Sequence, residues 1–90
     1  MSGRVSYRVA VKRSAEREMD RLGKAIFGRV TRAILSLEAD PRPHGCTKLR
    51  GLEEYRIRVG DYRVLYTIDD RIRLIEIIAV GHRREVYRDL

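Results

Sequence analysis

Two short segments past the middle of the chain alternate with the two-residue period of a β-strand. In residues 55–59 (YRIRV) and 62–68 (YRVLYTI), aliphatic and aromatic side chains fall on one face and mostly polar ones on the other. The Gly-Asp pair between the segments is typical of a tight hairpin turn. The sequence therefore predicts an antiparallel hairpin with one face suited to a core and one face that carries Arg56, Arg58 and Arg63.

The flanking segments supply the other elements. Residues 5–11 (VSYRVAV) alternate well enough for a first strand. Residues 15–22 and 24–39 have apolar residues at helical spacing, and Pro41 ends the second of these helices. Residues 72–80 are almost wholly apolar, which is typical of a central strand. Residues 40–54 show little periodicity and are expected to form one long loop.

The expected order is therefore β-α-α-β-β-β, which is typical of the α+β class. We expect a helical hairpin packed on one face of a mostly antiparallel four-stranded sheet. The opposite face, with its arginines, is expected to stay open as a concave basic surface. A chain of 90 residues has the size of one domain, so residues 1–90 are expected to fold together.

The charge of the chain points to an anionic partner. The formal net charge is +7, and only three of the 20 basic residues are lysines. Nucleic acid, the ribosome, an acidic protein or a membrane surface would each suit this charge. Arginine adds bidentate contacts to phosphate, and the tyrosines of the hairpin add rings that can stack on bases. The last third of the chain thus resembles a surface for single-stranded RNA.

Other features narrow the cellular context. Cys46 is the only cysteine, which excludes an intramolecular disulfide and a cysteine-based zinc site. The sequence has no apolar leader, and no stretch approaches the roughly 18 apolar residues of a membrane span. We therefore expect a cytoplasmic protein without a membrane segment, metal or cofactor.

Three strings together resemble a known family. They are KLRG at 48–51, YRIRVGDYRVLY at 55–66 and VGHRREVY at 80–87. In this combination the chain resembles the RelE/ParE superfamily of toxins from type II toxin–antitoxin systems, over nearly its whole length. RelE-like members cleave mRNA in the ribosomal A site, where the 2′-hydroxyl attacks the neighbouring phosphate. ParE-like members share the fold, inhibit DNA gyrase and lack the nuclease residues.

The resemblance assigns roles to several residues and favours the RelE-like branch. Arg63 and Arg83 would bind the scissile phosphate, and Tyr87 would stack on or orient a nucleotide. Arg56 and Arg58 would line the groove and complete the catalytic set. Contacts with RNA or the ribosome would come from Lys48, Arg50 and Arg84.

One departure from the family pattern concerns proton transfer. The best-known RelE proteins have two lysines on the strand where this chain has Arg56 and Arg58. An arginine cannot lose its proton in a protein, so neither residue can serve as a general base. The local candidates for proton transfer are His82, Asp61 and Glu85.

The resemblance also implies partners. We expect an acidic, RelB-like antitoxin that folds on this chain, together with the ribosome and mRNA. Contact with DNA would occur only through the antitoxin. Three alternatives remain open: a ParE-like gyrase inhibitor, a plain RNA-binding module, and a degenerate toxin that only binds its antitoxin.

Overall fold

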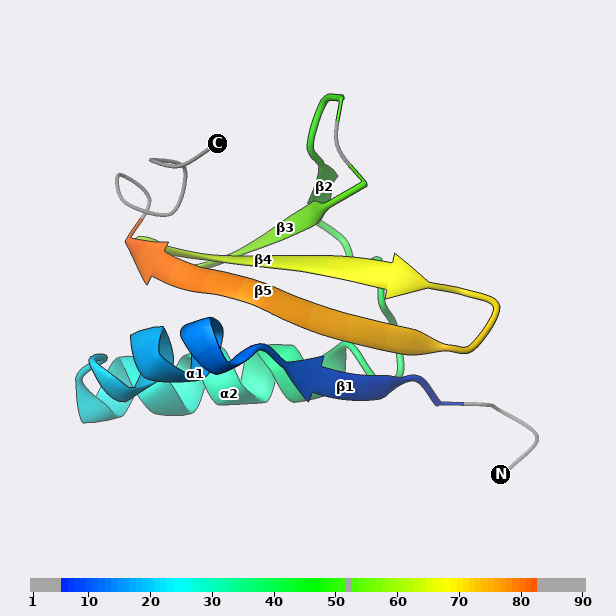
Figure 1. Cartoon of the computed structure of the whole chain (residues 1–90). Coiled ribbons are helices and arrows are strands. Elements are labelled where there is room, and N and C mark those ends of the chain that lie inside the picture. The colour runs from blue at the N-terminus through cyan, green and yellow to red at the C-terminus, as the bar shows by residue number, and fades with distance from the viewer. Residues whose placement is uncertain (1–5, 52, 83–90) are drawn as a thin grey trace.

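The computed structural model describes residues 6–51 and 53–82. Two helices, α1 (Arg13–Asp20) and α2 (Lys24–Ser36), form one layer, which lies on one side of the sheet in Figure 1. The sheet has five strands in the order β1-β5-β4-β3-β2. Their bounds are Arg8–Val11 for β1, Thr47–Lys48 for β2, Tyr55–Val59 for β3, Tyr62–Asp69 for β4 and Leu74–His82 for β5. The expected α+β class is confirmed.

The sheet is mixed, and it has one strand more than expected. Strands β3, β4 and β5 form an antiparallel meander, whereas β1 pairs in parallel with β5. The expectation of one loop across residues 40–54 was wrong, because β2 pairs there with β3 through Thr47 and Lys48. Two residues are too few for a periodic pattern, so the sequence carries no signal for this strand.

The helical spacing places an apolar stripe against the sheet. Ala15 and Met19 of α1 and Val30 and Ile34 of α2 are buried, one turn apart on each helix. From the sheet, β3, β4 and β5 contribute to the same core. Its sheet side consists of Ile57, Val59, Val64, Tyr66, Ile75, Ile77 and Val80. The strand residues that alternate with these therefore face away from the helices.

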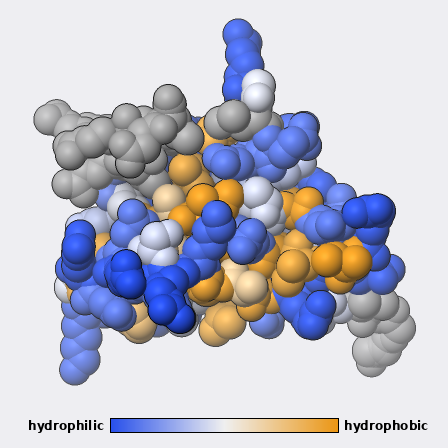
Figure 2. Space-filling model, in the orientation of Figure 1, coloured by the Kyte–Doolittle hydropathy of each residue, from blue (hydrophilic) through white to orange (hydrophobic). Residues whose placement is uncertain are grey.

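Some apolar side chains stay on the surface. Phe27 and Leu35 of α2 and Ile72 after β4 are 40–55% exposed. Figure 2 shows hydrophilic and apolar residues interspersed over the visible face, with apolar surface gathered toward the β4–β5 turn. Single exposed apolar residues are common on soluble domains. Among the residues that the structure describes, no helix is long and apolar enough to cross a membrane.

A polar cluster ties three distant segments together near the β4–β5 turn. The carboxylate of Asp70 accepts hydrogen bonds from Arg42 Nη2 at 2.9 Å and from the Tyr7 hydroxyl at 2.6 Å. The guanidinium of Arg42 also lies over the ring of Tyr55, 5.2 Å from its centroid. The bond from Arg42, with that from Tyr7, lowers the pKa of Asp70 below its ordinary value. The cluster joins the start of β1, the loop after α2 and the turn before β5.

Acid is expected to weaken this cluster. Because the pKa of Asp70 is lower in the folded protein, its carboxylate stabilises the fold above the unfolded value of about 4. That contribution is lost as the pH falls through the lowered pKa. Asp70→Asn should therefore reduce the urea midpoint slightly at about pH 7 and progressively less toward about pH 3, since solvent screens this exposed pair. An unchanged difference between the two proteins across that range would contradict the role given to the carboxylate.

Candidate nucleic-acid interface

Three arginines lie on the side of the sheet that faces away from the helices, and we call them the arginine face: Arg56, Arg58 and Arg63. The register of β3 and β4 pairs Arg58 directly with Arg63, and Arg56 with Leu65. Their neighbours Ile57, Val59 and Val64 belong to the core, so strand alternation turns the arginines to the other side. The register thus places these three residues on one face of the sheet, as the sequence predicts.

Arg63 is far less accessible than an open surface would make it. Arg63 is only 7% exposed, whereas Arg56 is half-buried and Arg58 is exposed. The expectation of a fully open basic surface was therefore wrong at Arg63. Strand alternation fixes the face on which a residue lies but not how deeply it is covered.

The described residues around Arg63 do not neutralise its charge. Nη1 donates to the carbonyl oxygen of Tyr62 at 3.3 Å, and Nε has no hydrogen-bond partner. Within the described part of the chain, Arg63 forms no ion pair, so neither Asp61 nor Glu76 neutralises it. Like charges directly opposite each other on neighbouring strands are destabilising, and a buried charge requires compensation. An anion that reaches Arg58 and Arg63 would relieve both costs.

The remaining basic candidates lie toward the β2 edge of the sheet. Arg56 Nη2 donates to Thr47 Oγ1 at 3.2 Å, which connects the arginine face to β2. Lys48 is exposed in β2 and lies 3.7 Å from a carboxylate oxygen of Glu53. Arg50 is exposed in the turn that follows. Lys48 and Arg50 are thus separated from Arg63 by the width of β3.

The proton-transfer candidates do not gather at the arginine face. His82 pairs with Tyr62 across β4 and β5, and the two rings meet edge to face with centroids 5.7 Å apart. Because Tyr62 alternates with Arg63, this ring pair lies on the helix side of the sheet. Asp61 is exposed in the β3–β4 turn. The other assigned residues lie outside the described part of the chain: Arg83, Arg84, Glu85 and Tyr87.

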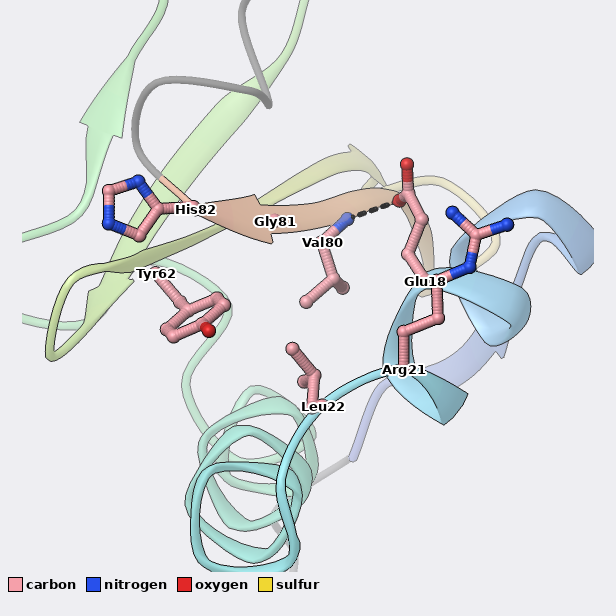
Figure 3. Close-up of a pocket in the computed structure, with 7 residues that line it drawn as sticks. All are labelled: Glu18, Arg21, Leu22, Tyr62, Val80, Gly81 and His82. Atoms are coloured by element: carbon pink, nitrogen blue, oxygen red, sulfur yellow. Dashed lines mark hydrogen bonds between the residues drawn. The ribbon is translucent and has the colours of Figure 1, made fainter.

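A cavity that the sequence did not indicate lies beside that ring pair. It has a volume of about 380 Å³, and its lining comes from α1, the loop before α2, and the ends of β4 and β5 (Figure 3). On one wall, Glu18 Oε1 accepts a hydrogen bond from the Val80 backbone N–H at 2.7 Å. Strand β1 ends at Val11, and Glu18 supplies the acceptor that a longer β1 would have offered to this edge of β5. No sequence pattern reveals such a contact between residues so far apart.

The described residues provide no evident metal centre. No group of three or more His, Cys, Asp or Glu side chains lies close enough within the described ranges to hold a metal ion. Cys46 is a free, partly buried thiol.

Comparison with known proteins defines the class of protein. The sequence model of the family described as "ParE toxin of type II toxin-antitoxin system, parDE" matches residues 7–87. The chain therefore belongs to this family of type II toxins.

Several of the similar proteins are toxins named RelE. Toxin RelE of Mycobacterium tuberculosis (strain H37Rv) is 34% identical over 98% of this chain and 93% of its own length. The crystal structure of the toxin–antitoxin complex RelBE2 from M. tuberculosis matches with a TM-score of 0.79 and 30% identity, over 88% of this chain and 100% of that one. The crystal structure of isolated E. coli RelE matches with a TM-score of 0.76 and 28% identity, over 91% of this chain and 92% of that one. The resemblance to the RelE/ParE superfamily is thus confirmed.

Proposed function

We propose that this toxin is a ribosome-dependent endoribonuclease that cleaves mRNA in the A site and thereby inhibits translation in the cytoplasm. The proposal rests on the direct pairing of Arg58 with Arg63, which is buried and forms no ion pair with any described residue. RNA supplies a continuous row of phosphates that would neutralise such a pair. The similarity to proteins named RelE over nearly the whole chain supports the same activity.

The proposed chemistry is the attack of a ribose 2′-hydroxyl on the adjacent phosphate, with departure of the 5′-oxygen. The reaction forms a 2′,3′-cyclic phosphate and a 5′-hydroxyl. Negative charge builds on the phosphate in the transition state, and fixed guanidinium groups stabilise it there. Arg63, together with Arg83, would bind the non-bridging oxygens, while Arg56 and Arg58 would hold the flanking strand. Tyr87 would orient a nucleotide.

The small number of acid–base groups found near Arg63 among the described residues supports the proposed dependence on the ribosome. Among the described residues, no hydrogen bond or ion pair joins Arg63 to a histidine or a carboxylate. An enzyme that contributes mainly positive charge needs its substrate held in line for attack, because orientation then supplies much of the rate. The ribosome would provide that alignment, with Lys48, Arg50 and Arg84 in contact with RNA phosphates. His82, Asp61 and Glu85 remain our candidates for proton transfer.

The toxin is also expected to bind an acidic, RelB-like antitoxin. The solved relatives of M. tuberculosis and Pyrococcus horikoshii are complexes of toxin and antitoxin. The net charge of +7 favours an acidic partner for this chain as well. Any contact with operator DNA would then belong to the antitoxin.

A second function has a specific observation in its favour. The family model that matches residues 7–87 carries the description of a ParE toxin, and both lysines of well-known RelE proteins are replaced by arginine. A ParE-like protein would inhibit DNA gyrase without cleaving RNA. A degenerate toxin would do neither and would only bind its antitoxin.

Two assays with the same purified protein separate these functions. The proposal predicts that the toxin stops cell-free translation of a preformed mRNA and leaves gyrase supercoiling of plasmid DNA unaffected. Addition of antitoxin should restore translation. Inhibited supercoiling with normal translation would instead establish the ParE-like function, and no effect in either assay would identify a degenerate toxin.

A further inference from the structure

The cavity beside Tyr62 has the walls of a binding site for a flat, polar ring. In Figure 3, the Tyr62 ring stands on one side and Glu18 on the other, with Leu22 and Val80 between them. The edge-to-face contact with His82 supports the Tyr62 ring. A volume of about 380 Å³ accommodates a nucleobase with its sugar rather than a large ligand.

The cavity and the arginine face lie on opposite sides of β5, next to each other at a residue that has no side chain. Gly81 lines the cavity, and the β4–β5 register places Gly81 directly opposite Arg63. Only the backbone of β5 separates the two sites at this point. A strand of RNA whose phosphate lies at Arg63 could therefore pass over the end of the sheet and place a neighbouring base in the cavity.

One polar group of the cavity, the Glu18 carboxylate, is held by a hydrogen bond from the backbone of β5. Glu18 Oε1 is held by the Val80 N–H at 2.7 Å, and within the described residues the other carboxylate oxygen has no hydrogen-bond partner. Arg21, from the same end of α1, lines the same wall and forms no ion pair with described residues. Glu18 thus has one carboxylate oxygen that accepts no hydrogen bond from the described residues, and Arg21 adds a positive charge to the same lining.

These features discriminate between bases. A single carboxylate oxygen accepts one N–H, which the exocyclic amino groups of cytosine, adenine and guanine can donate. The only ring N–H that uracil can donate lies between two carbonyl oxygens, and these repel a carboxylate. Stacking on Tyr62 would be similar for all four bases, since every base has a π-face. The preference would therefore come from Glu18.

We propose that this cavity is a nucleobase subsite that binds one nucleotide of single-stranded RNA and prefers a base with an exocyclic amino group over uracil. Tyr62 stacks on the base, and Glu18 accepts a hydrogen bond from its amino group. Arg21 binds the phosphate of the same nucleotide. The identity of the ligand rests on the proposed ribonuclease function.

Titration of the ¹⁵N-labelled protein with cytidine 5′-monophosphate and with uridine 5′-monophosphate tests the subsite directly. The amide signals of Val80 and Gly81 should shift on addition of the cytidine nucleotide, and its affinity should exceed that of the uridine nucleotide by about tenfold, the effect of one hydrogen bond to a charged group. Equal affinities, or shifts confined to the arginine face, would overturn the proposal. If neither nucleotide shifts the amide signals of Val80 and Gly81, as expected for a cavity that binds a protein side chain, the proposal is also overturned.

Glu18→Gln is the decisive variant because it keeps the oxygen that accepts from Val80 and replaces the second carboxylate oxygen by an NH₂ donor. The glutamine carbonyl can still accept from Val80, while its NH₂ replaces the free oxygen and donates to O4 of uracil. The preference should therefore reverse toward uridine. Glu16→Gln, the same change on an exposed residue of the same helix, should leave the cytidine preference intact. A cytidine preference that persists in Glu18→Gln would contradict the assignment.

Tyr62→Leu provides a second, independent variant if Glu18→Gln does not fold. It keeps an apolar side chain and removes the stacking surface. The affinity for both nucleotides should therefore fall by about tenfold or more. Unchanged affinities would overturn the role of the ring. Because the titration uses neither ribosomes nor cleavage, its failure is distinct from failure of the proposed function, which would appear as absent mRNA cleavage despite a normal cytidine preference.

Discussion

Arg63→Ala is expected to lower the rate of ribosome-dependent mRNA cleavage by roughly 10²–10³-fold, as for other preorganised groups that stabilise transition-state charge. The side chain is buried, faces Arg58 across the β3–β4 pair, and has an Nε without a partner. If Arg63 binds the scissile phosphate as proposed, its removal would leave the developing charge without a rigidly held donor. Cleavage on programmed ribosomes under single-turnover conditions measures this effect apart from binding.

Two further variants make that result specific. Arg63→Lys keeps the positive charge but lacks the bidentate fork, so its rate should fall between those of the wild-type protein and Arg63→Ala. Arg71→Ala, in the exposed turn between β4 and β5, removes a cation at the far end of the sheet and should cleave normally. Circular dichroism shows whether each variant is folded. A folded Arg63→Ala variant with wild-type activity would exclude Arg63 from the site.

Tyr66→Ala is expected to reduce the free energy of unfolding by about 3–5 kcal/mol, which is the usual cost of truncating a buried aromatic side chain. Tyr66 is fully buried, stacks on Tyr55 with centroids 5.9 Å apart, and donates its hydroxyl to the carbonyl oxygen of Pro41 at 2.8 Å. Burial raises the pKa of this hydroxyl, so it stays protonated as a donor. A domain of this size has little stability to spare, and the variant should be largely unfolded at physiological temperature.

Tyr66→Phe separates the ring from its hydroxyl. Loss of one hydrogen bond should cost roughly 1 kcal/mol and leave the core intact. Urea unfolding of the three proteins, followed by circular dichroism, gives both differences. If the phenylalanine variant were as unstable as the alanine variant, the bond to Pro41 rather than core packing would be the dominant contribution of Tyr66.

The parts of the fold that follow from the sequence are those with a repeated pattern. The alternation in 55–68 predicts the β3–β4 hairpin, and the apolar character of 72–80 predicts that β5 lies inside the sheet, where β4 and β1 flank it. The spacing of Val30 and Ile34 predicts the buried side of α2. The parallel pairing of β1 with β5 and the two residues of β2 depend on tertiary contacts, for which local periodicity has no signal.

The candidate site was predictable to the same extent. Alternation places Arg56, Arg58 and Arg63 on one face, because a strand has only two sides. The burial of Arg63 depends on how the sheet is covered, and the contact of Glu18 with Val80 depends on where β1 ends. Neither can be read from nearby residues. The cavity at Tyr62 is formed by α1 and the ends of β4 and β5 together, which are far apart in the sequence (Figure 3).

We propose above that this toxin cleaves mRNA held by the ribosome, with Arg63 at the scissile phosphate. Primer extension on a defined mRNA, with and without programmed ribosomes, tests it most directly. We expect cuts within the A-site codon by the wild-type protein, very slow cleavage of the naked RNA, and loss of the ribosomal cuts in Arg63→Ala. Equal cleavage of naked and ribosome-bound mRNA, or no cleavage of either by a protein that still binds its antitoxin, would contradict it.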